Sequence, residues 1–173
     1  MMLFRHAHPA SAFMWEGAEQ PTARWHVRGD GPVQYFATTA DGAWAELLRH
    51  EEIVDPEDLM GISDRAMWVV EADELSLVRP MLDAAVLTGG LDSYAQCQLE
   101  AARLRQAGSP GLIAPSAALI AGAARSYYVD EGQRYEVGPS EMVALFGKRP
   151  DLRGQLVAIG RPDPLILERV RQL

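Results

Sequence analysis

Glycine and proline interrupt this sequence about every ten to twenty residues, and this spacing limits its helices and strands to short segments. Short strands and helices that follow one another are typical of an α+β fold. The chain has 173 residues and contains no internal repeat, low-complexity tract or long Pro/Gly/Ser-rich linker. We therefore expect a single α+β domain over residues 1–173, with short mixed strands and flanking helices.

The charge balance argues against two classes of binding partner. The chain carries 16 basic and 24 acidic side chains, a formal net charge of −8. Non-specific binding to nucleic acids or anionic membranes depends on Lys and Arg, so we expect neither role. Among the 16 basic residues only Lys148 is a lysine, and the others are arginines suited to bidentate binding of phosphate or carboxylate.

The few cysteine and histidine residues give no support to a disulfide or a metal site. Cys97 is the only cysteine, which indicates a reducing compartment. For His6 and His8, a solvated or locally hydrogen-bonded pair is favoured over metal binding. No apolar stretch reaches about 18 residues, and the N-terminus lacks the apolar run of a signal peptide. We therefore expect a soluble, cytoplasmic protein without a metal cofactor.

The clearest structural signal is a strand followed by a helix. Residues 33–37 have strand composition, and the Thr-Thr-Ala-Asp sequence that starts at Thr38 resembles a helix N-cap. Apolar residues then recur at helical spacing over residues 40–50, which predicts an amphipathic helix lying on a core. Glu46 and His50 lie four residues apart on one flank of its apolar stripe, at the expected border between core and cleft.

Other segments give weaker signals. Strands are predicted over residues 66–70, 111–114, 126–129 and 156–159, and helices over residues 92–106, 140–146 and 165–171. Cys97 falls on the apolar stripe of the helix over residues 92–106, so it is interpreted as a small core residue.

Three familiar enzyme motifs are absent from the sequence: the Rossmann fingerprint, the P-loop and the nucleophile elbow of α/β-hydrolases. What remains is a set of polar residues near the ends of predicted elements, namely Arg24, Tyr35, Glu46 and Ser116. Each alone has an ordinary structural explanation: a surface ion pair for Arg24, a half-buried sheet position for Tyr35, solvation beside Arg49 for Glu46, and a turn cap for Ser116.

Taken together, these residues resemble the RES domain family, named for an arginine, a glutamate and a serine. The resemblance rests on Ala-Arg24-Trp, on the Gly-Pro-Val-x-Tyr35 strand, on Ala-x-x-Glu46 followed by His50, and on Pro-Ser116. Its most specific part is the stretch of residues 23–50. The chain departs from the family where asparagine commonly follows the Arg-Trp pair and this sequence has a histidine, and in the alanine-rich stretch of residues 117–124.

The resemblance implies a bacterial toxin that degrades NAD⁺, by phosphorolysis to nicotinamide and an ADP-ribose phosphate, on a fold similar to ADP-ribosylating toxins. It implies that Arg24, Glu46 and Ser116 are catalytic and that Arg5, Arg24, Tyr35 and Ser116 bind NAD⁺. It also implies a cognate antitoxin protein, which would carry any DNA-binding part of the pair. NAD⁺ is then a substrate, inorganic phosphate a co-substrate, and no separate cofactor is needed.

The chemistry of NAD⁺ cleavage suggests a role for each residue. Nicotinamide leaves as a neutral group, so the site needs no general acid and must instead stabilise positive charge on the ribose, for which Glu46 is the candidate. Arg24 and Arg5 are the candidate clamp on the diphosphate. Tyr35 could stack on the nicotinamide ring, and Ser116 could hydrogen-bond a phosphate or ribose oxygen without acting as a nucleophile.

Two other functions are compatible with the same residues. One is a non-catalytic module of the same fold that binds a nucleotide or a protein partner. The other is a transferase that attaches ADP-ribose to a protein. The sequence is also compatible with a homodimer.

Overall fold

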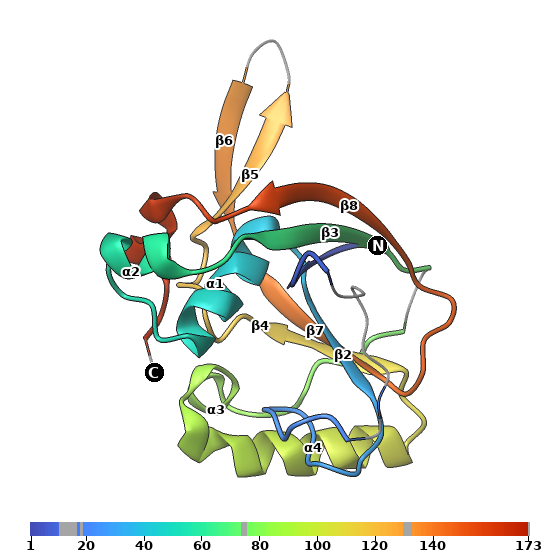
Figure 1. The fold of residues 1–173 in the computed structure, drawn as a ribbon. Coiled ribbons are helices and arrows are strands. Elements are labelled where there is room, and N and C mark those ends of the chain that lie inside the picture. Colours follow the sequence, from blue (N-terminus) through green and yellow to red (C-terminus); the bar gives the residue numbers. More distant parts are fainter. Residues whose placement is uncertain (11–16, 18, 74–75, 130–132, 173) are drawn as a thin grey trace.

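The computed structural model describes residues 1–10, 17, 19–73, 76–129 and 133–172, and Figure 1 shows their arrangement. The strands are β1 (Met2–Ala7), β2 (Val33–Ala37), β3 (Arg65–Glu71), β4 (Gly111–Pro115), β5 (Ala124–Val129), β6 (Gln133–Gly138), β7 (Glu141–Phe146) and β8 (Arg153–Gly160). The α-helices are α1 (Ala40–His50), α2 (Pro56–Gly61), α3 (Ala84–Thr88) and α4 (Tyr94–Gln106), and the 3₁₀ helices are η1 (Leu91–Ser93) and η2 (Pro164–Arg169). The α+β class predicted from the glycine and proline spacing is confirmed.

Within the described residues, six strands form one sheet in the order β4-β7-β2-β1-β3-β8. Every neighbouring pair in this sheet is antiparallel. β5 and β6 pair with each other as a separate hairpin, which projects from the body of the molecule at the top of Figure 1. The order places β1 and β2 at the centre of the sheet, although 25 residues separate the end of one from the start of the other.

The centre of the sheet is split. β1 and β2 pair at a single register position, Phe4 opposite Ala37. β1 is paired with β3 along its whole length, and β2 is paired with β7 along its whole length. The two strands therefore diverge beyond Phe4, and side chains of both reach the opening between them.

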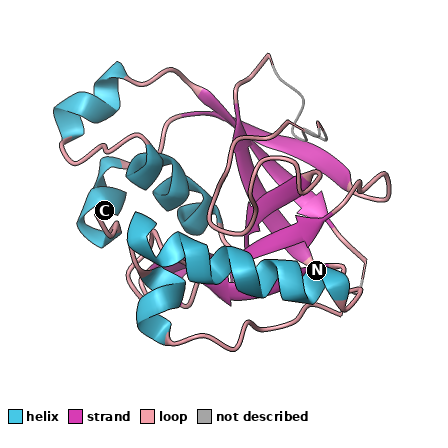
Figure 2. Ribbon diagram, turned by 90° about the horizontal axis from the view of Figure 1, so that it is seen from below, coloured by secondary structure: helices cyan, strands magenta, loops and turns pink. Residues whose placement is uncertain are grey.

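Helices gather on one side of the strands, as Figure 2 shows. Trp25 is fully buried in a cluster that joins α3 and α4 to β2, β4 and β7. A second cluster around Leu48 joins α1 and α2 to η2. The opposite face of the sheet buries Leu3, Phe36 and Val143 together with residues of the loops that follow β3 and β7. Most of the apolar area is thus removed from water on both faces of the central strands.

Helix α1 has the bounds that its sequence predicts, and its N-terminal cap lies one residue later than expected. The side-chain oxygen of Thr39 accepts a hydrogen bond from the backbone N–H of Gly42 at 3.0 Å. Thr38 Oγ1 instead accepts from the backbone N–H of Glu141 at 2.9 Å, which ties the start of the helix to β7. The predicted apolar stripe is buried, since Leu47 is 3% exposed and Leu48 is not exposed.

The helix predicted over residues 140–146 is wrong, because residues 141–146 form strand β7. Met142, Val143, Ala144 and Leu145 are all buried, and β7 is hydrogen-bonded to β2 on one side and to β4 on the other. A strand buried on both faces is apolar at consecutive positions, so its sequence shows no alternation that separates it from a short buried helix. The expected C-terminal helix is the 3₁₀ helix η2.

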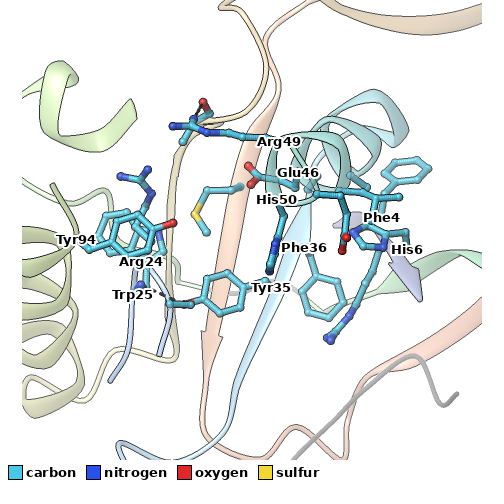
Figure 3. A pocket seen from close by; sticks show the side chains of 18 of the residues that line it. Phe4, His6, Arg24, Trp25, Tyr35, Phe36, Glu46, Arg49, His50 and Tyr94 are labelled. Carbon is cyan, nitrogen blue, oxygen red and sulfur yellow. Dashed lines mark hydrogen bonds between the residues drawn. The ribbon is translucent and has the colours of Figure 1, made fainter. Parts of the chain in front are cut away.

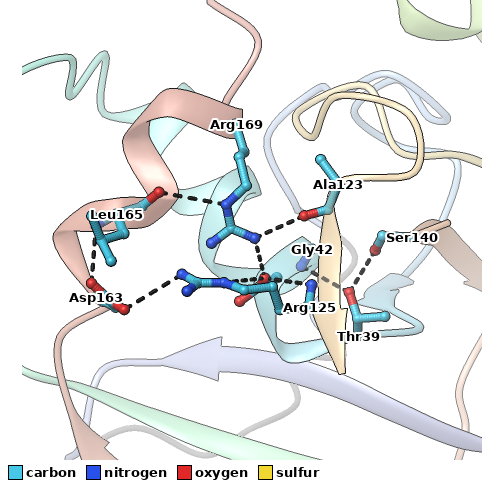
Figure 4. Close-up of polar contacts among 9 residues, drawn as sticks. Thr39, Gly42, Ala123, Arg125, Ser140, Asp163, Leu165 and Arg169 are labelled. Atoms are coloured by element: carbon cyan, nitrogen blue, oxygen red, sulfur yellow. Dashed lines mark hydrogen bonds and ion pairs between the residues drawn. The ribbon is translucent and has the colours of Figure 1, made fainter. Parts of the chain in front are cut away.

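An ion-pair network fastens the hairpin and η2 to the first turn of α1 (Figure 4). One carboxylate oxygen of Asp41 accepts hydrogen bonds from the Arg125 backbone N–H at 2.8 Å and from Arg169 Nη1 at 2.5 Å. Arg169 Nη1 also donates to the Ala123 carbonyl at 2.8 Å, and Arg125 pairs with Asp163 at 3.4 Å. Asp41 therefore joins three segments that are far apart in the sequence.

Replacing Asp41 by Ala is expected to lower the free energy of unfolding by about 2 kcal/mol, because it leaves Arg169 and the Arg125 N–H without their shared acceptor. Urea unfolding followed by circular dichroism measures this change. The matched control is Asp64→Ala, since the Asp64 side chain is 58% exposed and its ion pair with Arg161 is worth about 1 kcal/mol or less. Equal losses in the two variants would contradict a special role for Asp41.

Candidate active site

A cavity of about 640 Å³ opens at the split in the sheet, between α1 above and the 22–25 and 89–94 segments (Figure 3). This volume lies in the range of about 300–1,000 Å³ that is typical of small-molecule sites. All of the predicted site residues except Ser116 line it directly, and Ser116 reaches it through Glu46. The charged and titratable lining residues are Arg5, His6, Arg24, Tyr35, Glu46, Arg49, His50, Glu51, Arg65 and Tyr94.

Glu46 projects from α1 into the middle of the lining (Figure 3). Its Oε1 accepts a hydrogen bond from Ser116 Oγ at 3.3 Å. Burial raises the pKa of Glu46, and the positive charges of Arg49 and Arg24 and the bond from Ser116 act in the opposite direction. The site therefore holds a desolvated carboxylate whose charge is supported mainly by arginines.

Ser116 follows the end of β4 and is 5% exposed. Its Oγ accepts hydrogen bonds from the backbone N–H groups of Ala118 at 3.2 Å and Leu119 at 3.1 Å. The hydroxyl hydrogen is then directed to Glu46, which completes the bonding of Ser116. Ser116 is thus both the turn cap that its sequence suggests and a group that orients the carboxylate.

Arg24 is buried and already engaged in several contacts within the protein. Its Nη1 donates to Ser93 Oγ at 2.8 Å and to the Val86 carbonyl at 3.2 Å, and its Nη2 donates to the Gly89 carbonyl at 2.5 Å. The guanidinium also lies over the ring of Tyr94, 4.7 Å from its centroid. The surface ion pair considered for Arg24 is therefore wrong, while its contact with a diphosphate stays a prediction.

Arg5 marks another part of the lining, on the β1 side of the split. Its Nη1 donates to Gln34 Oε1 across the opening, and its guanidinium lies 5.8 Å from the centroid of the Phe36 ring. Burial lowers the pKa of Arg5 to about 10. No ion pair to a carboxylate is found for it among the described residues, so its charge is available to an anionic ligand.

Tyr35 and His26 are held together in the wall of the cavity. Tyr35 Oη accepts from the Trp25 backbone N–H at 3.1 Å and lies 2.9 Å from His26 Nδ1. Burial raises the pKa of Tyr35, so its phenol stays protonated. Burial is also the main cause that lowers the pKa of His26. His26, which replaces the asparagine common in the family, thus orients the Tyr35 hydroxyl.

The cavity lining contains residues that the sequence did not single out, among them Arg49 and Tyr94. Arg49 was considered only as a neighbour of a solvated Glu46, yet both of its Nη atoms bond to carbonyls in the cavity wall. Tyr94 lies on the same helix as Cys97, and the guanidinium of Arg24 packs over its ring. The spacing of three residues between Glu46 and Arg49 on one helix was the available signal.

The histidines at the N-terminus do not form a pair. His6 stacks on Trp44 with the ring planes 10° apart, and burial followed by the charges of Arg65 and Arg5 lowers its pKa to about 4. His8 is exposed, and its Nδ1 accepts from the Ala10 backbone N–H at 3.2 Å. The solvated or locally bonded state is confirmed for His8 and wrong for His6. Within the described residues no cluster of His, Cys, Asp and Glu could hold a metal ion.

The sequence model of the RES domain matches residues 2–155. The chain belongs to the RES family. The matched range contains every residue of the cavity lining, and also Ser116. A search of curated proteins finds no match.

Comparison with solved structures also finds a chain with a similar fold. The chain resembles one in the crystal structure of the M. tuberculosis MbcT–MbcA toxin–antitoxin complex, with a TM-score of 0.63. The two chains are 16% identical, and the alignment covers 96% of this chain and 86% of the other. This likeness shows a shared fold. In the described part of the chain, no helix is long and apolar enough to cross a membrane.

Proposed function

We propose that this RES domain cleaves NAD⁺ at the bond between nicotinamide and ribose, and that it acts as the toxin of a type II toxin–antitoxin pair. The observation that carries the proposal is Glu46, a desolvated carboxylate in a cavity whose lining otherwise favours anions. Four arginines and two glutamates line this cavity, although the chain as a whole has a net charge of −8. A dinucleotide needs that combination, because it carries two phosphates and a sugar on which positive charge develops.

In the cleavage step, the bond between the ribose C1′ and the pyridinium nitrogen breaks, and its electron pair leaves with nicotinamide. Nicotinamide departs neutral, so no proton has to be supplied. C1′ becomes positively charged, and the Glu46 carboxylate stabilises this charge across a medium of low polarity. An oxygen of inorganic phosphate then forms the new bond to C1′, and with water as acceptor the product is ADP-ribose and a proton is released.

The arginines support binding of the remaining groups. The charge of Arg5 is not neutralised by an ion pair with a described carboxylate, which suits it to a phosphate of NAD⁺ or to the attacking phosphate. Arg65 lies on the same side, where its ion pair with Glu51 is long at 4.0 Å. The ring of Tyr35 lies in the cavity wall and is available for stacking on nicotinamide.

The assignment as a toxin is supported by membership of the RES family and by the fold shared with a chain of the MbcT–MbcA toxin–antitoxin complex. A cognate antitoxin would then bind this chain and block its activity. Production of the chain alone in bacteria is expected to stop growth, and co-production with the product of the neighbouring gene is expected to restore it.

The direct test is incubation of the purified protein with NAD⁺, with and without inorganic phosphate, followed by chromatography of the products. We expect release of nicotinamide, with ADP-ribose phosphate formed when phosphate is present. Labelled NAD⁺ in cell extract separates the transferase alternative, because only a transferase leaves label on macromolecules. Calorimetric binding of NAD⁺ with no product at any protein concentration would favour a non-catalytic module and contradict the proposal.

A further inference from the structure

Arg49 has an unusual place for a charged side chain. It lies in the last turn of α1, three residues after Glu46, and is only 6% exposed. Its Nη1 donates to the Ala117 carbonyl, and its Nη2 donates to the Gly89 carbonyl at 3.0 Å. Both hydrogen-bond partners are neutral, so the guanidinium charge is not cancelled by them.

The two carbonyls belong to the segments that form the cavity wall around Glu46. Ala117 follows Ser116, whose hydroxyl donates to Glu46. Gly89 directly precedes the segment with Leu91 and Tyr94, which both line the cavity. Arg49 therefore connects α1 to two segments that are not adjacent in sequence, and Figure 3 shows it next to Glu46.

The Gly89 carbonyl also accepts from Arg24 Nη2, so two guanidinium groups meet at one oxygen. There is little room for this turn to adjust, since a Cβ at Gly89 would lie 2.7 Å from the Ala85 carbonyl oxygen. The position of Gly89 is thus set by packing on one side and by both arginines on the other.

Arg49 also acts on Glu46 through its charge. Of the groups that lower the pKa of Glu46 against the effect of burial, Arg49 has the largest influence and Arg24 the second largest. The positive charge of Arg49 therefore favours the ionised form of this carboxylate and opposes the effect of burial.

We propose that Arg49 is a positioning residue, which locks the 89–91 and 116–119 segments around Glu46 and keeps a fixed positive charge beside that carboxylate. The proposal rests on the NAD⁺-cleaving function. Its two parts depend on different properties of arginine. The bridge needs a planar group with separate donors for two carbonyls, whereas the charge effect needs only a cation.

Two substitutions separate the two parts. Arg49→Lys keeps the charge and loses one end of the bridge, so we expect kcat for NAD⁺ cleavage to fall by about 10- to 100-fold with an unchanged acid limb of the pH profile. Arg49→Met loses both, so the acid limb should also move to higher pH, because Glu46 then takes up its proton more readily. The control is Arg103→Met, an arginine on the outer face of α4 that is 56% exposed and pairs with Glu100. Wild-type kcat in Arg49→Lys, or an unmoved acid limb in Arg49→Met, would overturn the proposal.

Two further measurements do not depend on turnover. ¹³C NMR of labelled glutamate side chains should show Glu46 titrating at higher pH in Arg49→Met than in the wild type. Amide hydrogen exchange at Ala118 and Leu119, whose N–H groups bond to Ser116, should become faster in both Arg49 variants and stay unchanged in Arg103→Met. If the Glu46 titration and the amide exchange change as expected but the protein does not cleave NAD⁺, the proposed function is refuted and the positioning role of Arg49 stands. If neither the Glu46 titration nor the amide exchange changes in the Arg49 variants, the positioning role is refuted.

Discussion

Glu46→Gln is expected to lower kcat for NAD⁺ cleavage by about 10²- to 10³-fold, which corresponds to about 3–4 kcal/mol of lost transition-state stabilisation. The amide has nearly the same shape and can still accept the hydrogen bond from Ser116, but it carries no negative charge. Since positive charge develops on the ribose only as the C–N bond breaks, the loss should fall on kcat. The affinity for NAD⁺, measured by calorimetry, should change by less than about threefold.

The control for this prediction is Glu51→Gln, the other glutamate of the cavity lining. Its side chain is 49% exposed, so solvent screens its charge, and we expect a far smaller loss than for Glu46. Equal effects of the two substitutions, or a Glu46→Gln variant with wild-type kcat, would show that the carboxylate does not stabilise the transition state.

The elements that could be predicted from the sequence are those with a turn or a capping residue at their ends. The strand over residues 33–37 and the helix over residues 40–50 have the predicted bounds, because a turn precedes the strand and a threonine caps the helix. Strand β7 was missed because its apolar residues face apolar neighbours on both sides, and only the tertiary structure decides between strand and helix for such a segment. The single pairing of Phe4 with Ala37 is likewise set by how the other strands pack.

The sequence predicted which residues belong to the candidate site but not the contacts that each of them makes. Arg24, Glu46 and Ser116 do come together at one cavity, as the resemblance implies. The contacts made by each could not be predicted, since Ser93, Gly89 and the other partners of Arg24 lie more than 60 residues away in the sequence. The structure shows that Arg24 and Glu46 both line the cavity, and that Ser116 lies outside the lining and donates a hydrogen bond to Glu46.

His6 is expected to make the protein sensitive to acid. Its pKa is lowered from about 6.5 to about 4 in the folded state, so the unfolded chain binds more protons between these two values. The contribution of the neutral His6 to the free energy of unfolding is therefore fully present above pH 6.5. It is lost as the pH falls toward 4, by up to about 3 kcal/mol for a shift of this size. The favourable effect of protonating Glu46, whose pKa is raised, has the opposite sign, so the contribution of His6 must be isolated by substitution.

The measurement compares urea unfolding of the wild type and His6→Phe between pH 7.5 and pH 4. Phenylalanine keeps an aromatic ring against Trp44 and cannot take up a proton, so the wild type should lose about 3 kcal/mol relative to the variant over this range. The control is Phe4→Leu on the same strand, a substitution that should lower stability by the same amount at every pH. Parallel curves for wild type and His6→Phe, together with a His6 NMR titration near pH 6.5, would show that the folded protein does not hold this imidazole neutral. An acid-sensitive His6 would in turn show that the β1 wall of the cavity, which also carries Arg5, contributes a pH-dependent part of the stability of the fold.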